Sequence, residues 1–467
     1  MIKDWRAKLL QLIKEGASML KNLKKLGCTV LAAAMLMTAM AGCSGSSGGE
    51  TSSAASGEST GESSAASSEA KLSGSITVAG WNDAADALSE EAKAFMKENP
   101  GTTVTVQKVD SNYTKLYSQL AANTDVPDVV QLQNRDLLSF KNKYPDAWMD
   151  LTDLVEPEKD NFDSFALSLV TVDDKYYAVP WDVGPCALYY RKDIFEKAGV
   201  DVSSIKTYDD YIEAGKKIVK ATGGKTKMLG FDYGGSSSDD TTMMLLNQLG
   251  GQYYDESGKV KLDSDEMVKA MELLKKMKDA GITINLANEW DDRIKATEND
   301  QVATIPYAVW YAGTLQSSNA DQKGKWGIAT LPAFEDGGST QANLGGSVLA
   351  VSSETQNADL AKAFVKFSLM TSEGNKINLD TGKLFTSYKP SYDDDEYKTT
   401  DEYFGVSVGT TFSKLSSDIK EVSFGPYFTD VNNALKTAVG NIFTQDKDIK
   451  TALSDATSTA QKAVDNE

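Results

Sequence analysis

The chain has 467 residues, carries a formal net charge of −19 at pH 7 and contains no histidine. This length exceeds what one hydrophobic core usually serves, so we expect two lobes. The acidic charge excludes nucleic acid as a partner because its phosphates repel the chain, and the missing histidine excludes histidine triads, histidine general bases and histidine metal ligands.

The first 42 residues predict a signal peptide. Three lysines between positions 21 and 25 precede an apolar run, residues 26–41, that is shorter than the roughly 20 residues a membrane-spanning helix needs. Small residues then lead to Cys43, and this ending resembles a bacterial lipoprotein box, in which the cysteine receives a diacylglycerol and becomes the mature N-terminus. The resemblance implies that residues 1–42 are removed and that Cys43 is the lipid attachment site.

Two alternatives apply to this N-terminal segment. The segment could be an ordinary signal peptide, or Cys43 could be a cytosolic thiol. Residues 1–18 look like an upstream extension, because a start at Met19 instead of Met1 would give a signal peptide of normal proportions.

A flexible tether is expected behind the cysteine, over residues 43–72. Residues 44–70 are almost entirely Ser, Gly, Ala, Thr and Glu, and none of these side chains can anchor a core. Such a tether would hold a folded body off a bilayer while letting it reorient. We therefore expect a lipid-anchored body on the outer face of the cell membrane.

The three cysteines fit the predicted order of signal peptide, lipid attachment site and folded body. Cys28 would leave with the signal peptide and Cys43 would be lipidated, so Cys186 would be the free thiol of the mature chain. It lies in an apolar stretch, residues 185–188, which favours a small buried hydrophobe over a reactive thiol.

The folded body begins with alternating strand and helix patterns. Residues 75–79 predict a strand, and the helix that follows places Leu88 and Phe95 on one face. Residues 103–109 and 128–132 predict two more strands with a helical pattern between them. This alternation favours a parallel sheet covered by helices.

Polar residues follow the first and third of these strands. Trp81, Asn82 and Asp83 come after the first strand, and Gln133 comes after the third. In open parallel sheets, ligands bind beyond the carboxyl ends of the strands, so these four residues are candidates for ligand binding. The alternative for Asn82 and Asp83 is that one of them caps the following helix.

A longer pattern begins at residues 176–182, an aromatic-rich strand that contains Trp181 and Asp182. Two tyrosines, a polar pair and the sequence Ile-Phe-Glu-Lys-Ala-Gly follow it over residues 189–199. This stretch is similar to the segment in family 1 extracellular solute-binding proteins where the chain first crosses between lobes.

Further segments match this family in the same order. The resemblance covers about residues 75–460. Its parts are a helix start at 207–210, a turn at 255–260 before a helix capped by Ser264, a strand and turn at 303–310, a return strand at 345–351, and two terminal helices containing Val431, Leu435, Ala438, Ile449, Leu453 and Ala456.

The resemblance implies an α/β fold of the periplasmic-binding-protein type, with two lobes and a ligand cleft between them. Because the chain of such proteins crosses between lobes more than once, each lobe is discontinuous in sequence. We place the crossings near residues 181–187, 343–347 and 386–391, which assigns residues 73–184 and 347–388 to lobe 1 and residues 185–346 and 389–467 to lobe 2.

The candidate site combines aromatic and polar side chains. Sugars present C–H patches and hydroxyl edges, so their pockets pair aromatic faces with amides and carboxylates. The aromatic candidates are Trp81, Trp181, Trp310, Tyr311 and, by position, Phe428. The polar candidates are Asn82, Asp83, Gln133 and Asp182, with Asp232 closing from the second lobe. For each of them, core packing, helix capping or a solvated surface position is the alternative.

Two segments resemble motifs that bind a phosphate or a metal, but each lacks residues that the motif requires. Residues 224–226 end like a phosphate-binding loop, but Val219 stands where its first glycine must be. The acidic run at 393–396 lacks the ligand spacing and the glycine of a calcium loop. We expect neither a metal nor a cofactor.

The resemblance implies a lipid-anchored solute-binding protein of an ABC importer that is not an enzyme. It would capture a sugar or oligosaccharide between its lobes, hand it to the permease subunits and act as a monomer. A secreted glycosidase is the main alternative, because such an enzyme needs only two carboxylates about 5 to 9.5 Å apart. The second alternative is a surface sugar sensor without a transport role.

Overall fold

The computed structural model describes residues 71–235 and 240–466. The predicted signal peptide, Cys43 and nearly all of the predicted tether lie outside these ranges. The described residues form one compact unit. Among the described residues, no helix combines the length and the apolar character needed to cross a bilayer.

Lobe 1 is built on three parallel strands, as the alternating pattern predicted. β1 (Gly74–Gly80) lies between β2 (Thr102–Lys108) and β3 (Val129–Gln133). The side chains of a strand alternate between the two faces of the sheet, so Ile76 and Val78 share one face and pack into a core under α2 (Asn82–Glu98) and α13 (Ala358–Met370). Each predicted strand lies within one residue of its observed position.

The other face of this sheet is covered mainly around β3. Val130 and Leu132 pack with Phe140 of α4 (Leu137–Lys143) and with Trp148. The remaining helices and strands of lobe 1 are α3 (Thr114–Ala122), α5 (Thr152–Val155), α6 (Ser164–Ser168), β4 (Thr171–Val172), β5 (Lys175–Tyr176), α14 (Ser372–Ile377) and a π-helical turn, Asn378–Gly382.

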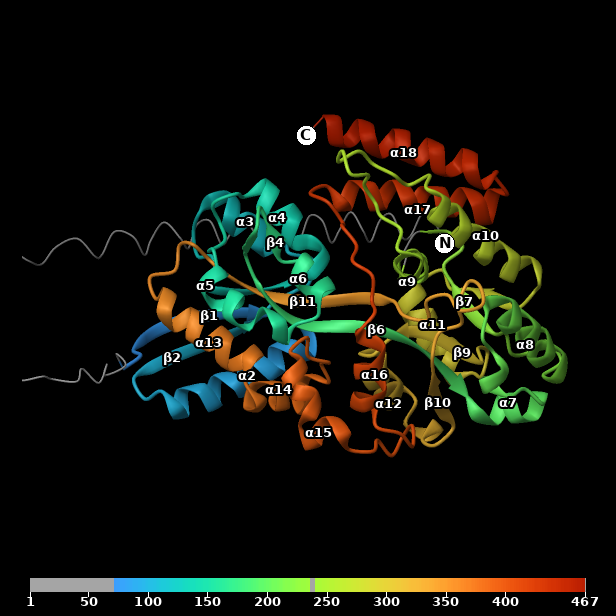
Figure 1. The fold of residues 1–467 in the computed structure, drawn as a ribbon, viewed down its shortest axis with the longest axis horizontal. Helices are drawn as coiled ribbons and strands as arrows, with labels where there is room; N and C mark the ends of the chain where they lie inside the picture. Colours follow the sequence, from blue (N-terminus) through green and yellow to red (C-terminus); the bar gives the residue numbers. More distant parts are fainter. Residues whose placement is uncertain (1–70, 236–239, 467) are drawn as a thin grey trace, which may run out of the picture. The chain divides into compact units, whose positions relative to one another are not determined.

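Two long antiparallel strands run from lobe 1 into lobe 2 (Figure 1). β6 (Val179–Arg191) pairs with β11 (Asn343–Val351) along its first half, and β11 pairs with β3. From Cys186 onward, β6 changes partner and pairs with β9 (Thr304–Ala308) and β10 (Trp326–Ala329). One seven-stranded sheet therefore continues from one lobe into the other.

A third segment runs beside β6 at the same level. The Val183 N–H donates to the Phe385 carbonyl at 3.0 Å, and the Ser387 N–H donates to the Trp181 carbonyl at 2.9 Å. Cys186 is fully buried here as a free thiol, as expected for a small hydrophobe, and burial raises its pKa well above the ordinary value.

Lobe 2 packs helices around β9 and a short parallel pair, β7 (Leu229–Phe231) and β8 (Thr283–Asn285). Its helices are α7 (Lys192–Ala198), α8 (Tyr208–Ala221), α9 (Asp240–Leu249), α10 (Asp265–Asp279), α11 (Glu289–Glu298), α12 (Tyr311–Ser318), α15 (Asp395–Lys398), α16 (Val408–Ser416), α17 (Phe428–Gln445) and α18 (Ile449–Asp465). The predicted helix starts are confirmed, because the Thr207 side chain caps α8 and the Ser264 side chain caps α10.

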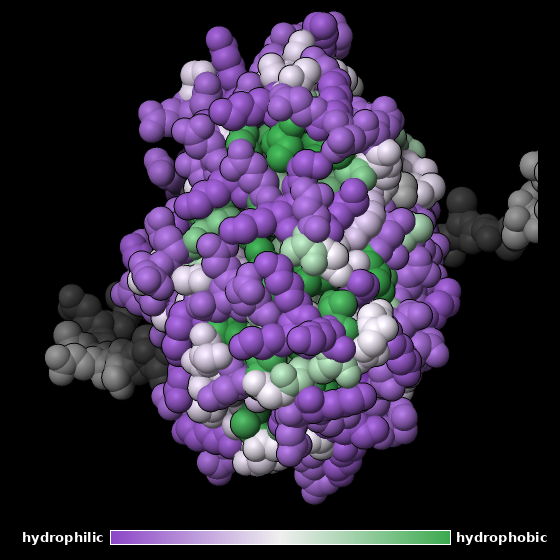
Figure 2. Space-filling model, turned by 90° about the vertical axis from the view of Figure 1, so that its right-hand side faces the viewer, coloured by the Kyte–Doolittle hydropathy of each residue, from purple (hydrophilic) through white to green (hydrophobic). Residues whose placement is uncertain are grey.

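The two terminal helices, α17 and α18, lie side by side, as predicted (Figure 1). Val431, Leu435 and Leu453 are among their fully buried residues and join the main core of lobe 2. Figure 2 shows the body from the side of α7 and α8, where hydrophilic side chains cover most of the face and hydrophobic ones form small separate groups.

Candidate functional site

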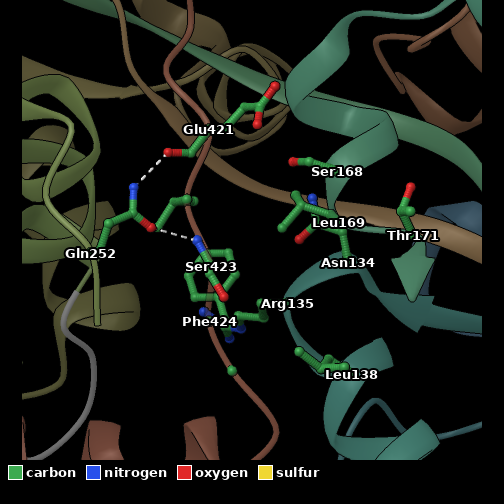
Figure 3. A pocket seen from close by; sticks show the side chains of 12 residues that line it. Asn134, Arg135, Leu138, Ser168, Leu169, Thr171, Gln252, Glu421, Ser423 and Phe424 are labelled. Carbon is green, nitrogen blue, oxygen red and sulfur yellow. Dashed lines mark hydrogen bonds between the residues drawn. The ribbon is translucent and has the colours of Figure 1, made fainter. Parts of the chain in front are cut away.

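A cavity of about 290 Å³ opens between the two lobes (Figure 3). Lobe 1 lines it with Asn134, Arg135, Leu138, Ser168, Leu169 and Thr171, and lobe 2 lines it with Gln252 and residues 421–425. Amide, guanidinium and hydroxyl groups therefore share this cavity with the ring of Phe424. Such a mixture of apolar surface and oriented polar groups is typical of a small-molecule site.

Hydrogen bonds fix the lobe 2 wall of this cavity. The Gln252 Nε2 donates to the Glu421 carbonyl at 2.8 Å, and the Ser423 N–H donates to the Gln252 Oε1 at 2.8 Å (Figure 3). Because one side chain bonds to two points of the segment, residues 421–423 are held in an extended path along the cavity.

Arg135 connects the lobes across the cavity. Its guanidinium carbon lies 5.8 Å from the centroid of the Phe428 ring at the start of α17, and its Nη1 lies 3.5 Å from the Met243 sulfur on α9. Gln133, two residues earlier, was the sequence candidate in this segment. The next two residues, Asn134 and Arg135, line the cavity, whereas Gln133 does not.

A chain of hydrogen bonds crosses the sheet where the lobes join. The Ser347 N–H donates to the Asp182 Oδ1 at 2.7 Å, the Gln131 Nε2 donates to the Ser347 Oγ at 3.1 Å, and the Trp81 N–H donates to the Gln131 Oε1 at 2.9 Å. Two sequence candidates, Asp182 and Trp81, are thus linked through Ser347 and Gln131, which the sequence did not single out.

Burial changes the acidity of Asp182. The side chain is nearly inaccessible, and desolvation raises its pKa to about 6, although the hydrogen bonds from Ser347 work in the opposite direction. Ionisation of this carboxyl therefore costs free energy in the folded protein.

Two glycines let lobe 1 approach the crossing closely. Gly345 and Gly346 have φ angles of 78° and 115°, which favour glycine, and they form an irregularity in the pairing of β11 with β6. A Cβ on Gly346 would lie 2.6 Å from the Asp182 carbonyl oxygen and 2.7 Å from the Asn134 Nδ2. The Asn134 Nδ2 donates to the Gly345 carbonyl at 3.0 Å, so this close approach creates a contact between the lobe 1 loop and the crossing strand.

Trp310 lies at the lobe 2 end of the crossing. Its Nε1 donates to the Leu344 carbonyl at 3.1 Å, and its ring is only partly buried. The rings of Tyr307 and Trp310 meet edge-on with centroids 4.9 Å apart. Of the aromatic candidates from the sequence, Trp310 is the one that keeps an accessible ring.

The other aromatic candidates are buried. Trp181 is fully buried in the core of lobe 1, and its Nε1 donates to the Asn378 Oδ1 at 2.9 Å, so its faces are closed to a ligand in this structure. Tyr311 is fully buried, and Phe428 and Trp81 are nearly so.

The remaining polar candidates lie on both lobes. Asn82 and Asp83 are exposed in the first turn of α2, and Gln133 is partly exposed at the end of β3. The capping position of α2 is Trp81, which makes no side-chain capping bond, so helix capping does not account for either polar residue. Asp232 is buried in lobe 2 and accepts the Gly234 N–H at 2.7 Å.

Comparison with known proteins shows which family the chain matches. The model of the bacterial extracellular solute-binding protein family matches residues 81–377. The arabinooligosaccharide-binding protein of Halalkalibacterium halodurans is 27% identical over 344 residues, which cover 71% of this chain and 75% of that protein. The lactose-binding protein of Rhizobium radiobacter is 27% identical over 381 residues, which cover 78% and 87%.

A solved structure agrees with these relatives. The ABC transporter-associated binding protein of B. animalis subsp. lactis, in complex with β-1,6-galactobiose, is 26% identical with a TM-score of 0.69, and the match covers 84% of this chain and 97% of that chain. The predicted two-lobed α/β fold is confirmed.

Proposed function

This chain belongs to the bacterial extracellular solute-binding protein family, and we propose that it captures a neutral sugar or oligosaccharide between its lobes and delivers it to the permease of an ABC importer. The family resemblance that the sequence indicated is confirmed by the match over residues 81–377. Two relatives support a sugar as the ligand, because one is named for binding arabinooligosaccharides and the other for binding lactose.

Two observations carry the proposal: Trp310 stays partly accessible at the crossing between the lobes, and a separate cavity is lined by amides and hydroxyls from both lobes. A sugar places its C–H face on an indole and directs its hydroxyls to amides and carboxylates. A ligand that contacts both lobes binds the closed arrangement better than an open one, and this difference in affinity favours closure.

We propose the following roles for the candidate residues. Trp310 stacks on a sugar ring, and Asn82, Asp83 and Gln133 bind hydroxyls from the lobe 1 side. Asp182 organises the crossing through Ser347. The buried candidates Trp81, Trp181, Tyr311, Phe428 and Asp232 stay predictions as ligand contacts, and their burial supports a role in holding the cleft in shape.

A neutral ligand fits the charges of the cleft better than an anionic one. The cavity lining contains one cation, Arg135, and one acid, Glu421. Arg135 already contacts Phe428 and Met243. A single engaged guanidinium does not make a phosphate site, because such sites gather several donors around the anion.

We further propose that Cys43 carries the lipid anchor, that residues 43–72 tether the body to the outer face of the cell membrane, and that the protein acts as a monomer. Cys43→Ser is expected to leave the body unprocessed or released from the membrane. Fractionation of cells that express each form measures this. Unchanged processing and membrane partitioning of the variant would contradict the anchor.

Calorimetric titration with arabinooligosaccharides, lactose and galactobiose tests the function. We expect micromolar binding of at least one of them, which corresponds to about −8 kcal/mol. The same sugars should stay intact during incubation, because we propose a binding protein and not a glycosidase. Release of reducing ends that depends on the protein, and that an acid-to-amide change in the cleft abolishes, would establish the enzyme instead.

A further inference from the structure

Trp290 is exposed where an indole is usually covered. It lies in the first turn of α11, and 41% of its surface is accessible. Only one other large hydrophobic side chain among the described residues, Val406, is classed as exposed. An exposed tryptophan gives up the free energy that its burial would contribute, so its position calls for a reason.

Trp290 stacks on the ring of Trp310. The two indoles are stacked with centroids 6.0 Å apart and an interplanar angle of 29°. Ring atoms in contact lie roughly 3.5 to 4 Å apart, so this larger separation indicates an offset stack. Tyr311 meets Trp290 edge-on at 5.9 Å and supports it from within the core.

A buried ion pair on the same helix holds this surface in place. Glu289 and Arg293 lie four residues apart on α11, are both nearly inaccessible and pair with each other. The guanidinium carbon of Arg293 lies 4.2 Å from the centroid of the Tyr307 ring. Because Glu289 and Arg293 anchor one face of α11 in the core, Trp290 is presented from a rigid support, which lowers the entropic cost of binding a ligand.

The surroundings of Trp290 suit a neutral polyol. Asp291 and Asp292 follow it directly; Asp291 is exposed and Asp292 is partly exposed. The Asn288 Nδ2 donates to Asp291 at 2.8 Å, the Asn288 N–H donates to Asp292 at 3.0 Å, and the Lys295 Nζ lies 3.7 Å from the Asp292 carboxylate. A carboxylate has about four acceptor sites, so both can also accept sugar hydroxyls. The same two charges would repel an anionic ligand.

We infer that Trp290 forms a second aromatic subsite, next to Trp310, that binds a further ring of an oligosaccharide. The inference rests on the proposed function, because a second ring has a place here only if Trp310 binds the first. Trp290 then makes affinity increase with the length of the sugar, and it determines that oligosaccharides are preferred over monosaccharides.

Titration calorimetry with two series of sugars tests the subsite: arabinose, arabinobiose and arabinotriose, and galactose, galactobiose and galactotriose. Trp290→Ala is expected to lower the affinity for the best-bound trisaccharide by about tenfold, in line with the loss of one aromatic stacking contact. The affinity for the corresponding monosaccharide should stay within about twofold. Trp290→Leu, which keeps apolar bulk, should behave like Trp290→Ala, whereas Trp290→Tyr should restore most of the affinity.

Val406→Ala is the matched control, since it removes the other exposed apolar side chain, and it should change no affinity. An equal loss for every length of sugar would overturn the inference, because Trp290 would then only support Trp310. Unchanged affinities in Trp290→Ala and Trp290→Leu would overturn it as well. If the unaltered protein bound neither series, the proposed function itself would fail, and this result is visible before any variant is made.

Discussion

Trp181 and Trp310 are set in two regions that share a local pattern and differ in their surroundings. Each tryptophan lies in or just after an apolar strand at the crossing between the lobes. Trp181 is fully buried under lobe 1 helices and donates to Asn378, whereas Trp310 keeps part of its ring accessible and donates to a backbone carbonyl of the crossing strand. The same residue type thus contributes to folding in one region and is available for binding in the other.

The largest expected effect tests the folding side of this comparison. Trp181→Ala should lower the free energy of unfolding by about 3 to 5 kcal/mol, because it leaves a cavity in a packed core. It also leaves the Asn378 side chain without its indole partner. Thermal melting measures the loss, and the fraction that still folds should bind sugar with unchanged affinity.

Trp181→Phe separates the contribution of core packing from the contribution of the hydrogen bond to Asn378. It keeps most of the ring and removes the hydrogen bond to the buried Asn378 side chain, so it should cost about 1 to 3 kcal/mol. A Trp181→Ala variant that melted like the unaltered protein but lost sugar affinity would show that this ring faces the ligand.

The next effect concerns the binding side. Trp310→Ala should reduce sugar binding by about 2 to 4 kcal/mol, by analogy with buried aromatic anchors in interfaces. Trp310→Phe should retain a large part of the affinity. Calorimetric titration together with thermal melting checks both variants. A variant that melted far below the unaltered protein yet bound sugar normally would place Trp310 with Trp181 as a core residue.

The smallest effect comes from Asp182, which directly follows Trp181 on β6 and belongs to the crossing instead of the core. Its pKa is raised from the ordinary 3.8 to about 6 by burial, so the folded state favours the protonated carboxyl. The penalty for ionisation is therefore absent below about pH 4, grows between pH 4 and 6, and reaches at most about 3 kcal/mol above that range.

Asp182→Asn removes this penalty and keeps an oxygen for the Ser347 N–H. We expect the variant to be more stable than the unaltered protein at pH 7, and the difference should shrink as the pH falls to 4. Urea unfolding at a series of pH values measures it. A stability difference that did not change between pH 4 and 7 would mean that Asp182 titrates as an ordinary surface acid.

Local patterns determined much of the fold. The three parallel strands follow from short strand patterns that alternate with helical patterns along the chain. The starts of α8 and α10 follow from Thr207 and Ser264, whose side chains bond to backbone groups three residues further on. Such features depend on neighbours in sequence, so a sequence pattern predicts them.

The site was predicted less completely. Trp310 and Asp182 were predicted because each lies at the end of a recognisable strand or crossing, and their roles in ligand binding stay predictions. Arg135 had a weak signal in its position two residues after Gln133. Trp290 had none, since a tryptophan among acidic residues at a helix start has the pattern of a solvated face, and its contact with Trp310 spans 20 residues of chain.

The sequence by itself determined which residues form strands, where helices begin and which aromatic residues stand near the lobe crossings. Only the tertiary structure decided which of those aromatic rings is covered. Trp181 is closed off partly by Asn378, which lies 197 residues away, and the position of Trp310 at the crossing is held by a bond to Leu344, 34 residues away. Burial depends on the distant segments that pack on a side chain, and the local order of residues does not specify them.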